Sequence, residues 1–73
     1  MLKGSRRGVV QKIQPLSVHG QVSWDVYFVD EENPEAQVAV ARVGLEAVDR
    51  TIEPGDRVEV HYVVGAVTRV EKL

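Results

Sequence analysis

The sequence predicts a single small all-β domain, and three observations support this. The chain has 73 residues, which leaves room for one domain with one small core. It contains sixteen valines against four leucines, and β-branched side chains pack well on a pleated sheet. Near the C-terminus, Val58, Val60, Tyr62 and Val64 occupy alternate positions, a period of two that indicates a half-buried strand. Val58, Val60 and Tyr62 are expected to face the core. A closed barrel would suit so small a core because it removes exposed strand edges.

The first strand is expected over residues 6–14, after a frayed arm at residues 1–5 and before a connection at residues 15–20. The apolar residues of this strand do not keep one phase along it. A long strand that bends and serves both halves of a barrel has this pattern, and Gly8 permits the bend.

The second and third strands are expected over residues 21–29 and 36–43, joined by a polar turn at residues 30–35. In the second strand the larger apolar set faces the core, with Trp24 as its largest member. The residues predicted to face inward are Val22, Trp24, Val26 and Phe28 in the second strand, and Val38 and Val40 in the third.

A change of period after the third strand predicts a short helix. Leu45, Val48 and Ile52 recur at a helical spacing, so one or two helical turns are expected within residues 44–51. An irregular loop is the alternative for this segment.

The last two strands form a hairpin that follows the Pro54-Gly55 turn. A two-residue type I′ turn at Val64-Gly65 is not expected, because valine disfavours a positive φ. The hairpin is instead expected to reverse through a bulged or three-residue turn with Gly65 in the left-handed conformation. On the last strand, the inward residues are Ala66, Thr68 and Val70.

Composition and charge restrict the compartment and the partners. The chain has no cysteine, which excludes disulfides and thiol chemistry. It shows no signal peptide and no apolar run near the roughly 20 residues that span a bilayer, so a soluble cytoplasmic protein away from membranes is expected. The net charge of −2 combines +4 in residues 1–24 with −6 in residues 25–49, and this is not the strongly basic balance that indicates nucleic-acid binding.

No catalytic or metal-binding motif is present. The sequence contains no nucleophile–base motif and no glycine-rich phosphate loop, and its two histidines, His19 and His61, fall short of the three ligands of a zinc enzyme. The acidic segment at residues 30–35 lacks the spacing of an EF-hand and is expected to be a solvated turn. The chain is therefore predicted to be a non-enzymatic protein without a metal or cofactor.

Two stretches carry a resemblance to a known fold family. The stretch IEPGDRVEVHYVVGAVTRV, from Ile52 to Val70, resembles the last two strands of many OB domains, and RRGVVQKIQ, from Arg6 to Gln14, resembles an OB first strand. Together with the order of elements, the whole chain resembles a five-stranded OB-like Greek-key barrel with one short helix between strands three and four. An SH3-like barrel is the alternative, because a Pro-Gly-Asp turn before a valine-rich strand occurs there too.

The resemblance implies a binding module whose ligand face covers strands two and three, with single-stranded nucleic acid as the first ligand to test. Tyr27 is the one aromatic residue there that could stack on a base, with a surface cross-strand role as the alternative. A basic rim and one outward glutamine complete the ligand-binding residues: Tyr27, Arg6, Arg7, Lys12, Arg42 and Gln37.

The second functional hypothesis is a protein-interaction or assembly subunit, either a homo-oligomer or a docking module, that uses the same face. Small outward side chains would let another protein surface approach closely. The predicted interface comprises Tyr27, Val29, Ala39, Ala41 and Val43.

Overall fold

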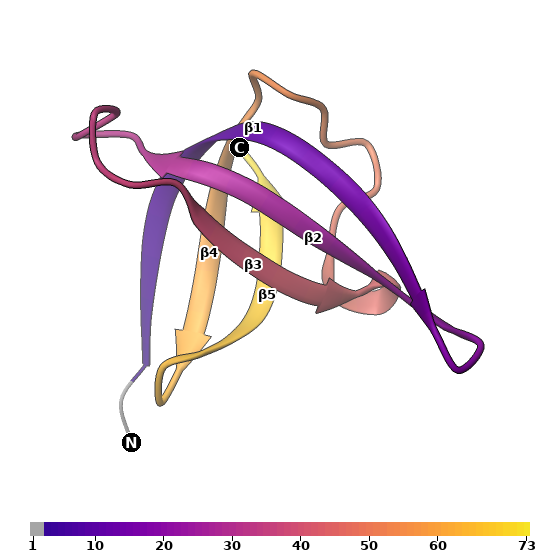
Figure 1. Cartoon of the computed structure of the whole chain (residues 1–73). Helices are drawn as coiled ribbons and strands as arrows, with labels where there is room; N and C mark the ends of the chain where they lie inside the picture. Colours follow the sequence, from indigo (N-terminus) through magenta and orange to yellow (C-terminus); the bar gives the residue numbers. More distant parts are fainter. Residues whose placement is uncertain (1–2) are drawn as a thin grey trace.

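The computed structural model describes residues 3–73, and these form an all-β fold, as the sequence predicts (Figure 1). Five antiparallel strands make one sheet in the order β3-β2-β1-β4-β5, and the sheet is not closed. The strands are β1 (Lys3–Val18), β2 (Gln21–Asp30), β3 (Ala39–Gly44), β4 (Arg57–Val63) and β5 (Ala66–Lys72); a single 3₁₀ turn, η1 (Leu45–Ala47), follows β3.

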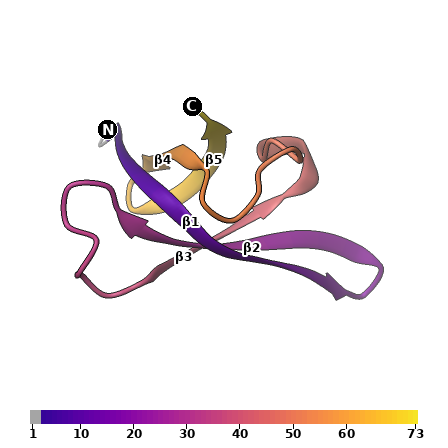
Figure 2. The ribbon, with the colours of Figure 1, turned by 90° about the horizontal axis from the view of Figure 1, so that it is seen from above.

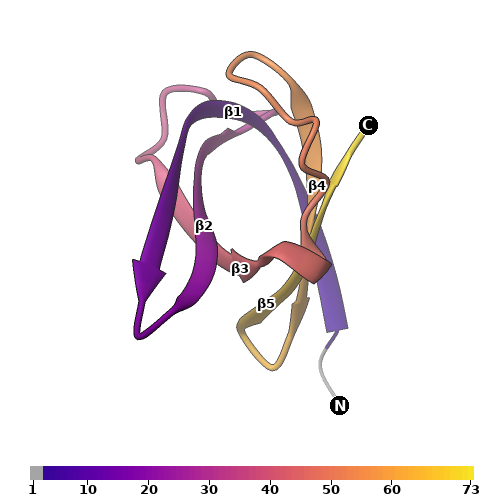
Figure 3. The ribbon, with the colours of Figure 1, turned by 90° about the vertical axis from the view of Figure 1, so that its right-hand side faces the viewer.

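Strand β1 is long, bends, and belongs to both halves of the sheet, which confirms the predicted bent strand. Residues 3–9 pair with β4 and residues 8–18 pair with β2. A bulge between Val10 and Lys12 lies where β1 turns from one partner to the other, and Figure 3 shows the resulting arch. The predicted bounds were too short, because Lys3–Ser5 pair with β4 and Pro15–Val18 pair with β2.

Gly8 allows Phe28 to pack closely against the backbone of β1. A Cβ atom at this position would lie 2.5 Å from Cδ2 of Phe28 and 2.8 Å from the carbonyl oxygen of Val29. The absence of a side chain therefore lets the largest fully buried residue pack against the β1 backbone. The bend that the sequence assigned to Gly8 coincides with the bulge beyond Val10.

Both hairpins reverse through two-residue turns. Val18 pairs with Gln21, and Val63 pairs with Ala66. The central residues have positive φ: 52° and 80° at His19 and Gly20, and 51° and 80° at Val64 and Gly65. Two positive φ values define a type I′ turn, whose twist matches that of the flanking strands. The prediction that Val64-Gly65 would not form such a turn was wrong: the hairpin twist outweighs the preference of one valine.

Pro15 lies in a part of β1 that has a neighbour on one side only. The β4 pairing ends at Val9, so residues 12–18 contact β2 alone, and in Figure 2 this hairpin extends away from β4 and β5. The two residues that flank a two-residue turn exchange hydrogen bonds, and bonded pairs alternate along the strand. Val18 and Gln21 are the first bonded pair, so Pro15, three residues before Val18, belongs to a pair that is not bonded. The nitrogen of Pro15 therefore faces the free edge, where no donor is needed.

The core lies on the inner face of the sheet. The largest fully buried side chains are those of Phe28, Val10, Val26, Val58, Val60 and Val70. Trp24 and Tyr62, both predicted to face inward, are half-buried and pack against this cluster. Val22 was also assigned to the core but is 44% exposed, because the β1–β2 hairpin extends past the other strands.

The predicted phases of β3 and β5 need correction. Val38 and Val40 are 48% and 50% exposed, whereas Ala41 and Val43 are buried, because pairing places Ala41 beside the fully buried Val26. On β5, Ala66 and Thr68 are exposed although Val70 is buried. A register shift opposite His61 and Tyr62 leaves one extra residue in β5, so the phase changes within the strand.

The β3–β4 connection is nearly all irregular, so the expected helix shrinks to the three residues of η1. Two apolar residues of this connection nevertheless join the core: Val48 and Ile52 are buried, and Val48 forms a parallel bridge with Val70 of β5. Asp49 and Asp56 hold the loop by accepting backbone N–H bonds from Thr51 and Glu53. In the part of the chain that the structure describes, no helix is long and apolar enough to cross a membrane.

Candidate binding surface

The outward side of strands β1, β2 and β3 forms one continuous surface, which we call the β1–β2–β3 outer face. In β2, Asp25 and Tyr27 alternate with the fully buried Val26 and Phe28, and in β3, Val40 and Arg42 alternate with the buried Ala41 and Val43. Directly paired residues of neighbouring strands lie on the same face. The register therefore gives the rows of the face: Lys12–Tyr27–Val40, Gln14–Asp25–Arg42, Leu16–Ser23–Gly44 and Val18–Gln21.

The first row combines an aromatic ring, a cation and an apolar side chain. The Nζ atom of Lys12 lies 5.5 Å from the centre of the Tyr27 ring, within the range of a cation–π interaction. Val40 lies on the other side of Tyr27 and is 50% exposed. The sequence prediction of an outward Tyr27 with Lys12 nearby is consistent with this arrangement.

The second row holds a two-point ion pair. Nε of Arg42 donates to Oδ1 of Asp25 at 2.7 Å, and Nη2 donates to Oδ2 at 3.1 Å. These hydrogen bonds hold the pKa of Asp25 below its ordinary value, although burial of the carboxylate acts in the opposite direction. Asp25 is 7% exposed as a residue, whereas the side chain of Arg42 is 64% exposed. Arg42 therefore covers Asp25 and presents the rest of its guanidinium to solvent.

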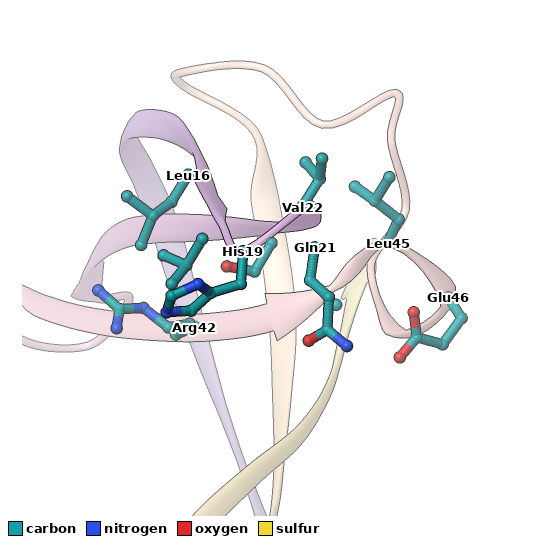
Figure 4. Close-up of a pocket in the computed structure, with 10 residues that line it drawn as sticks. Leu16, His19, Gln21, Val22, Arg42, Leu45 and Glu46 are labelled. Carbon is teal, nitrogen blue, oxygen red and sulfur yellow. The ribbon is translucent and has the colours of Figure 1, made fainter.

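A shallow hollow of about 950 Å³ continues the face toward the β1–β2 turn. Figure 4 shows its lining side chains, which come from the β1–β2 hairpin, β3 and η1. Both apolar and polar side chains line it. The lining residues are Leu16, Val18, His19, Gln21, Val22, Ser23, Arg42, Gly44, Leu45 and Glu46.

The structure does not bring the other predicted ligand residues to this face. Arg6 pairs with Asp30 at 3.3 Å, and Arg7 lies 3.6 Å from Glu59 on the outward side of β1 and β4. Gln37 is exposed in the loop before β3. The expected basic rim is thus divided, because the bend in β1 sends its first half to β4.

The predicted patch of small residues does not form. Ala41 and Val43 are 0% and 5% exposed, and Val29 is 8% exposed, so these three residues cannot line an outward interface. Ala39 is half-buried against the core. The β3 residues that do face outward, Val40 and Arg42, were missed as a pair because the strand was read in the opposite phase.

Most cations are neutralised within the molecule. Of the nine Lys and Arg residues, six form ion pairs within residues 3–73. Of the remaining three, Lys3 and Lys12 lie far apart on β1, and Arg50 lies in the β3–β4 connection. The described surface therefore has no concentration of free positive charge.

A second charged cluster covers the outward side of β4 and β5. Nε2 of His61 lies 3.0 Å from Glu71 and 3.5 Å from Glu59, and Arg69 lies 3.3 Å from Glu71. Residues 3–73 contain no group of three or more His, Asp or Glu side chains placed to hold a metal ion. The Arg69–Glu71 ion pair and the contacts of His61 with Glu59 and Glu71 therefore form a polar network on the outward side of β4 and β5.

Comparisons with family models, with curated proteins and with solved structures found no match to this chain.

Proposed function

We propose that this chain is a small non-enzymatic binding module of OB-like architecture, and that it binds another protein through the β1–β2–β3 outer face. One observation carries the proposal: exposed apolar side chains flank the Asp25–Arg42 ion pair on a regular sheet surface. Protein interfaces use apolar and aromatic groups with arginine at their centre and exclude unpaired charge.

The order of strands supports the OB-like part of the proposal. Strands β1, β2 and β3 follow one another in the sheet, β4 returns to pair with β1, and β5 pairs with β4. Strand β3 approaches β5, and the parallel bridge between Val48 and Val70 lies just beyond β3. In an OB domain the β2–β3 surface is the usual ligand face, and here the same strands carry the candidate surface.

The charge distribution favours a protein over a polyanion. Affinity for nucleic acid depends on the number of phosphates that Lys and Arg neutralise. On the outer face, Arg42 is already bonded to Asp25, which leaves Lys12 as the one cation there without an ion pair among the described residues. The apolar groups of Val40, Leu16 and Val18 remain for contact with another protein surface.

Single-stranded nucleic acid is the second candidate, because Lys12 of β1 and Tyr27 of β2 lie side by side on the outer face. One aromatic ring with one cation is the smallest platform for base stacking and phosphate contact. On this reading a base would displace the Lys12 ammonium from the ring and keep it near the phosphate.

Site-specific photo-crosslinking tests the proposal. A photoreactive residue at position 40, on the outer face, should crosslink a defined polypeptide in cells that produce the protein. The same residue at the exposed Thr68 position on β5 is the control and should not. Equal crosslinking from both positions, or none from position 40, would contradict the proposal.

Oligonucleotide titration separates the two candidates. A labelled single strand is titrated with wild type, Tyr27→Ala and Arg7→Ala at low and moderate salt. The protein-binding proposal predicts no saturable binding. Salt-sensitive binding that is weakened by Tyr27→Ala and unaffected by Arg7→Ala would establish the nucleic-acid candidate on this face, because Arg7 lies on the other half of the sheet.

A further inference from the structure

We infer that the protein partner contributes an extended segment that adds as a further strand to the free edge of β3. The inference rests on the proposed function and names the kind of partner. Strand β3 is the last strand of the sheet on this side (Figure 1). An edge strand presents unpaired backbone N–H and C=O groups, and extended segments of other proteins bind such edges through backbone hydrogen bonds.

The register identifies the backbone groups on this edge. Along β2, residues that bond to β1 alternate with residues that bond to β3. Gln21 bonds to β1 at the two-residue turn, so Val26, five residues later, bonds to its β3 partner Ala41. The N–H and C=O groups of Val40 and Arg42 therefore point away from β2, and within residues 3–73 they have no backbone hydrogen-bond partner.

The other free edges of the sheet are interrupted or covered. On β1, Pro15 faces the edge and has no N–H. On β5, Val48 forms a parallel bridge with Val70, and the N–H of Asp49 donates to the Val70 carbonyl at 3.2 Å. Strand β5 approaches β3 but forms no ladder with it. Strand β3 contains no proline, and among the described residues no segment pairs with its free edge.

Arg42 selects an acidic residue in the added strand. Its Nε and Nη2 atoms donate to Asp25, and a guanidinium has five N–H donors in a fixed planar arrangement. The Nη1–Nη2 side therefore still offers two parallel donors, on a side chain that is 64% exposed. A carboxylate fits such a pair of donors. Asp25 is 7% exposed and already accepts from Arg42 through both oxygens, so it holds the guanidinium in place.

The neighbouring rows select the residues on either side of this acid. Side chains of directly opposite residues lie on the same face of a sheet. Val40 is 50% exposed and favours an apolar side chain opposite it. The carboxylate of Glu46 lies over Gly44 and forms no ion pair within residues 3–73, so it favours a basic side chain there. An antiparallel segment therefore carries basic, acidic and apolar residues at alternate positions, in that order.

Fluorescence anisotropy with a designed peptide tests the inference. The probe is a fluorescein-labelled nine-residue peptide with lysine, aspartate and valine at its third, fifth and seventh positions and threonine elsewhere, because threonine favours strands. Wild type should bind it saturably. Exchange of the lysine and the aspartate should weaken binding at least about tenfold, because like charges then meet at Arg42 and Glu46. The exchange leaves the protein itself unchanged.

Backbone methylation of the peptide tests strand addition directly. The aspartate opposite Arg42 directs its N–H toward β3, whereas the threonine that follows it directs its N–H away. An N-methyl group on the aspartate should therefore weaken binding at least about tenfold, and one on that threonine should leave it nearly unchanged. Equal effects of the two methyl groups would show that the backbone does not join the sheet.

Two protein variants test the side-chain pairing, with circular dichroism to confirm that each is folded. Glu46 is exposed, so Glu46→Lys should keep the fold and weaken binding of the probe. A peptide with glutamate in place of the lysine should then regain affinity for this variant. Thr68→Ala, on β5, is the control and should leave binding unchanged.

Wild type that does not bind the probe at millimolar protein overturns the inference, as does binding that the lysine–aspartate exchange does not weaken. Sedimentation equilibrium of the protein alone should show a monomer; a dimer that Glu46→Lys dissociates would assign this edge to a second copy instead. The proposed function fails separately, because crosslinking from position 40 to a polypeptide, without binding of the probe, would retain the binding face and exclude strand addition.

Discussion

Val64 occupies a backbone conformation that valine disfavours, and its replacement by asparagine is expected to stabilise the fold. Its φ is 51° in the two-residue turn before Gly65. The left-handed conformation costs an L-residue about 1–2 kcal/mol, and β-branched side chains are rare there. Asparagine adopts this conformation readily and is preferred at this turn position. Val64→Asn should therefore recover most of the strain.

The substitution also removes an apolar contact, and exposure sets the size of that loss. The Val64 residue is 68% exposed, so about a third of its surface is removed from water. Full burial of a valine stabilises by about 1.5 kcal/mol, which makes the loss about 0.5 kcal/mol. The expected net gain is about 0.5–1.5 kcal/mol. For a domain of this size, each kcal/mol raises Tm by about 4–8 °C.

Thermal and urea unfolding of wild type and three asparagine variants measure this gain. Val40→Asn is the matched control, because Val40 is similarly exposed but lies within β3, where asparagine is disfavoured and should lower Tm. His19→Asn replaces the equivalent residue of the other hairpin, with φ of 52°; histidine tolerates this conformation better, so its gain should be smaller. A Val64→Asn variant that loses as much stability as Val40→Asn would refute the strain argument.

Three further predictions concern stability, pH and solubility. Gly8→Ala should destabilise by about 1–3 kcal/mol in urea unfolding because its Cβ meets Phe28, whereas Gly4→Ala, with open space around it, should change stability by less than about 0.5 kcal/mol; equal effects would contradict the packing role. Arg42→Gln should lower the free energy of unfolding near neutral pH. Because the folded pKa of Asp25 lies below its unfolded value of about 3.9, this loss relative to wild type should shrink as the pH falls through the folded pKa. A loss that stays constant down to acid pH would count against the stabilising role of the Asp25–Arg42 pair. Pro15→Thr restores a donor on the free edge of β1, so light scattering should show more aggregation at unchanged secondary structure, and unchanged scattering would argue that this edge needs no protection.

Local patterns in the chain were sufficient for the strand-rich fold. Alternation identified Val26, Phe28, Val58 and Val60 as core residues, and all four are buried. Alternation predicts core residues correctly where a strand has a neighbour on both sides and one of its faces is fully covered, because every second side chain is then buried. The apolar residues of the first strand do not keep one phase, and this also indicated that the strand bends. The sequence assigned the bend to Gly8, whereas the strand pairing places the bulge after Val10.

The site was less predictable, because it depends on how strands align with one another. A strand read one residue out of phase exchanges its two faces, and this happened in β3, where the larger valines were assigned inward and Ala41 outward. Val38 and Val40 read as core on hydrophobicity alone. The one local signal against this was Arg42, which shares their phase and is hard to bury without a partner.

The sequence by itself determined that this chain forms one small β domain with a valine core, a polar turn after β2 and a hairpin near the C-terminus, because these features follow from the alternation and turn residues of single segments. Only the tertiary structure decided which side chains meet. The register of β2 with β3 placed Arg42 on Asp25, the register of β1 with β2 placed Lys12 over Tyr27, and the bend in β1 separated both from Arg7. Such contacts join residues far apart in the chain, so no local pattern encodes them, and the positive φ at Val64 likewise comes from the twist of the hairpin around it.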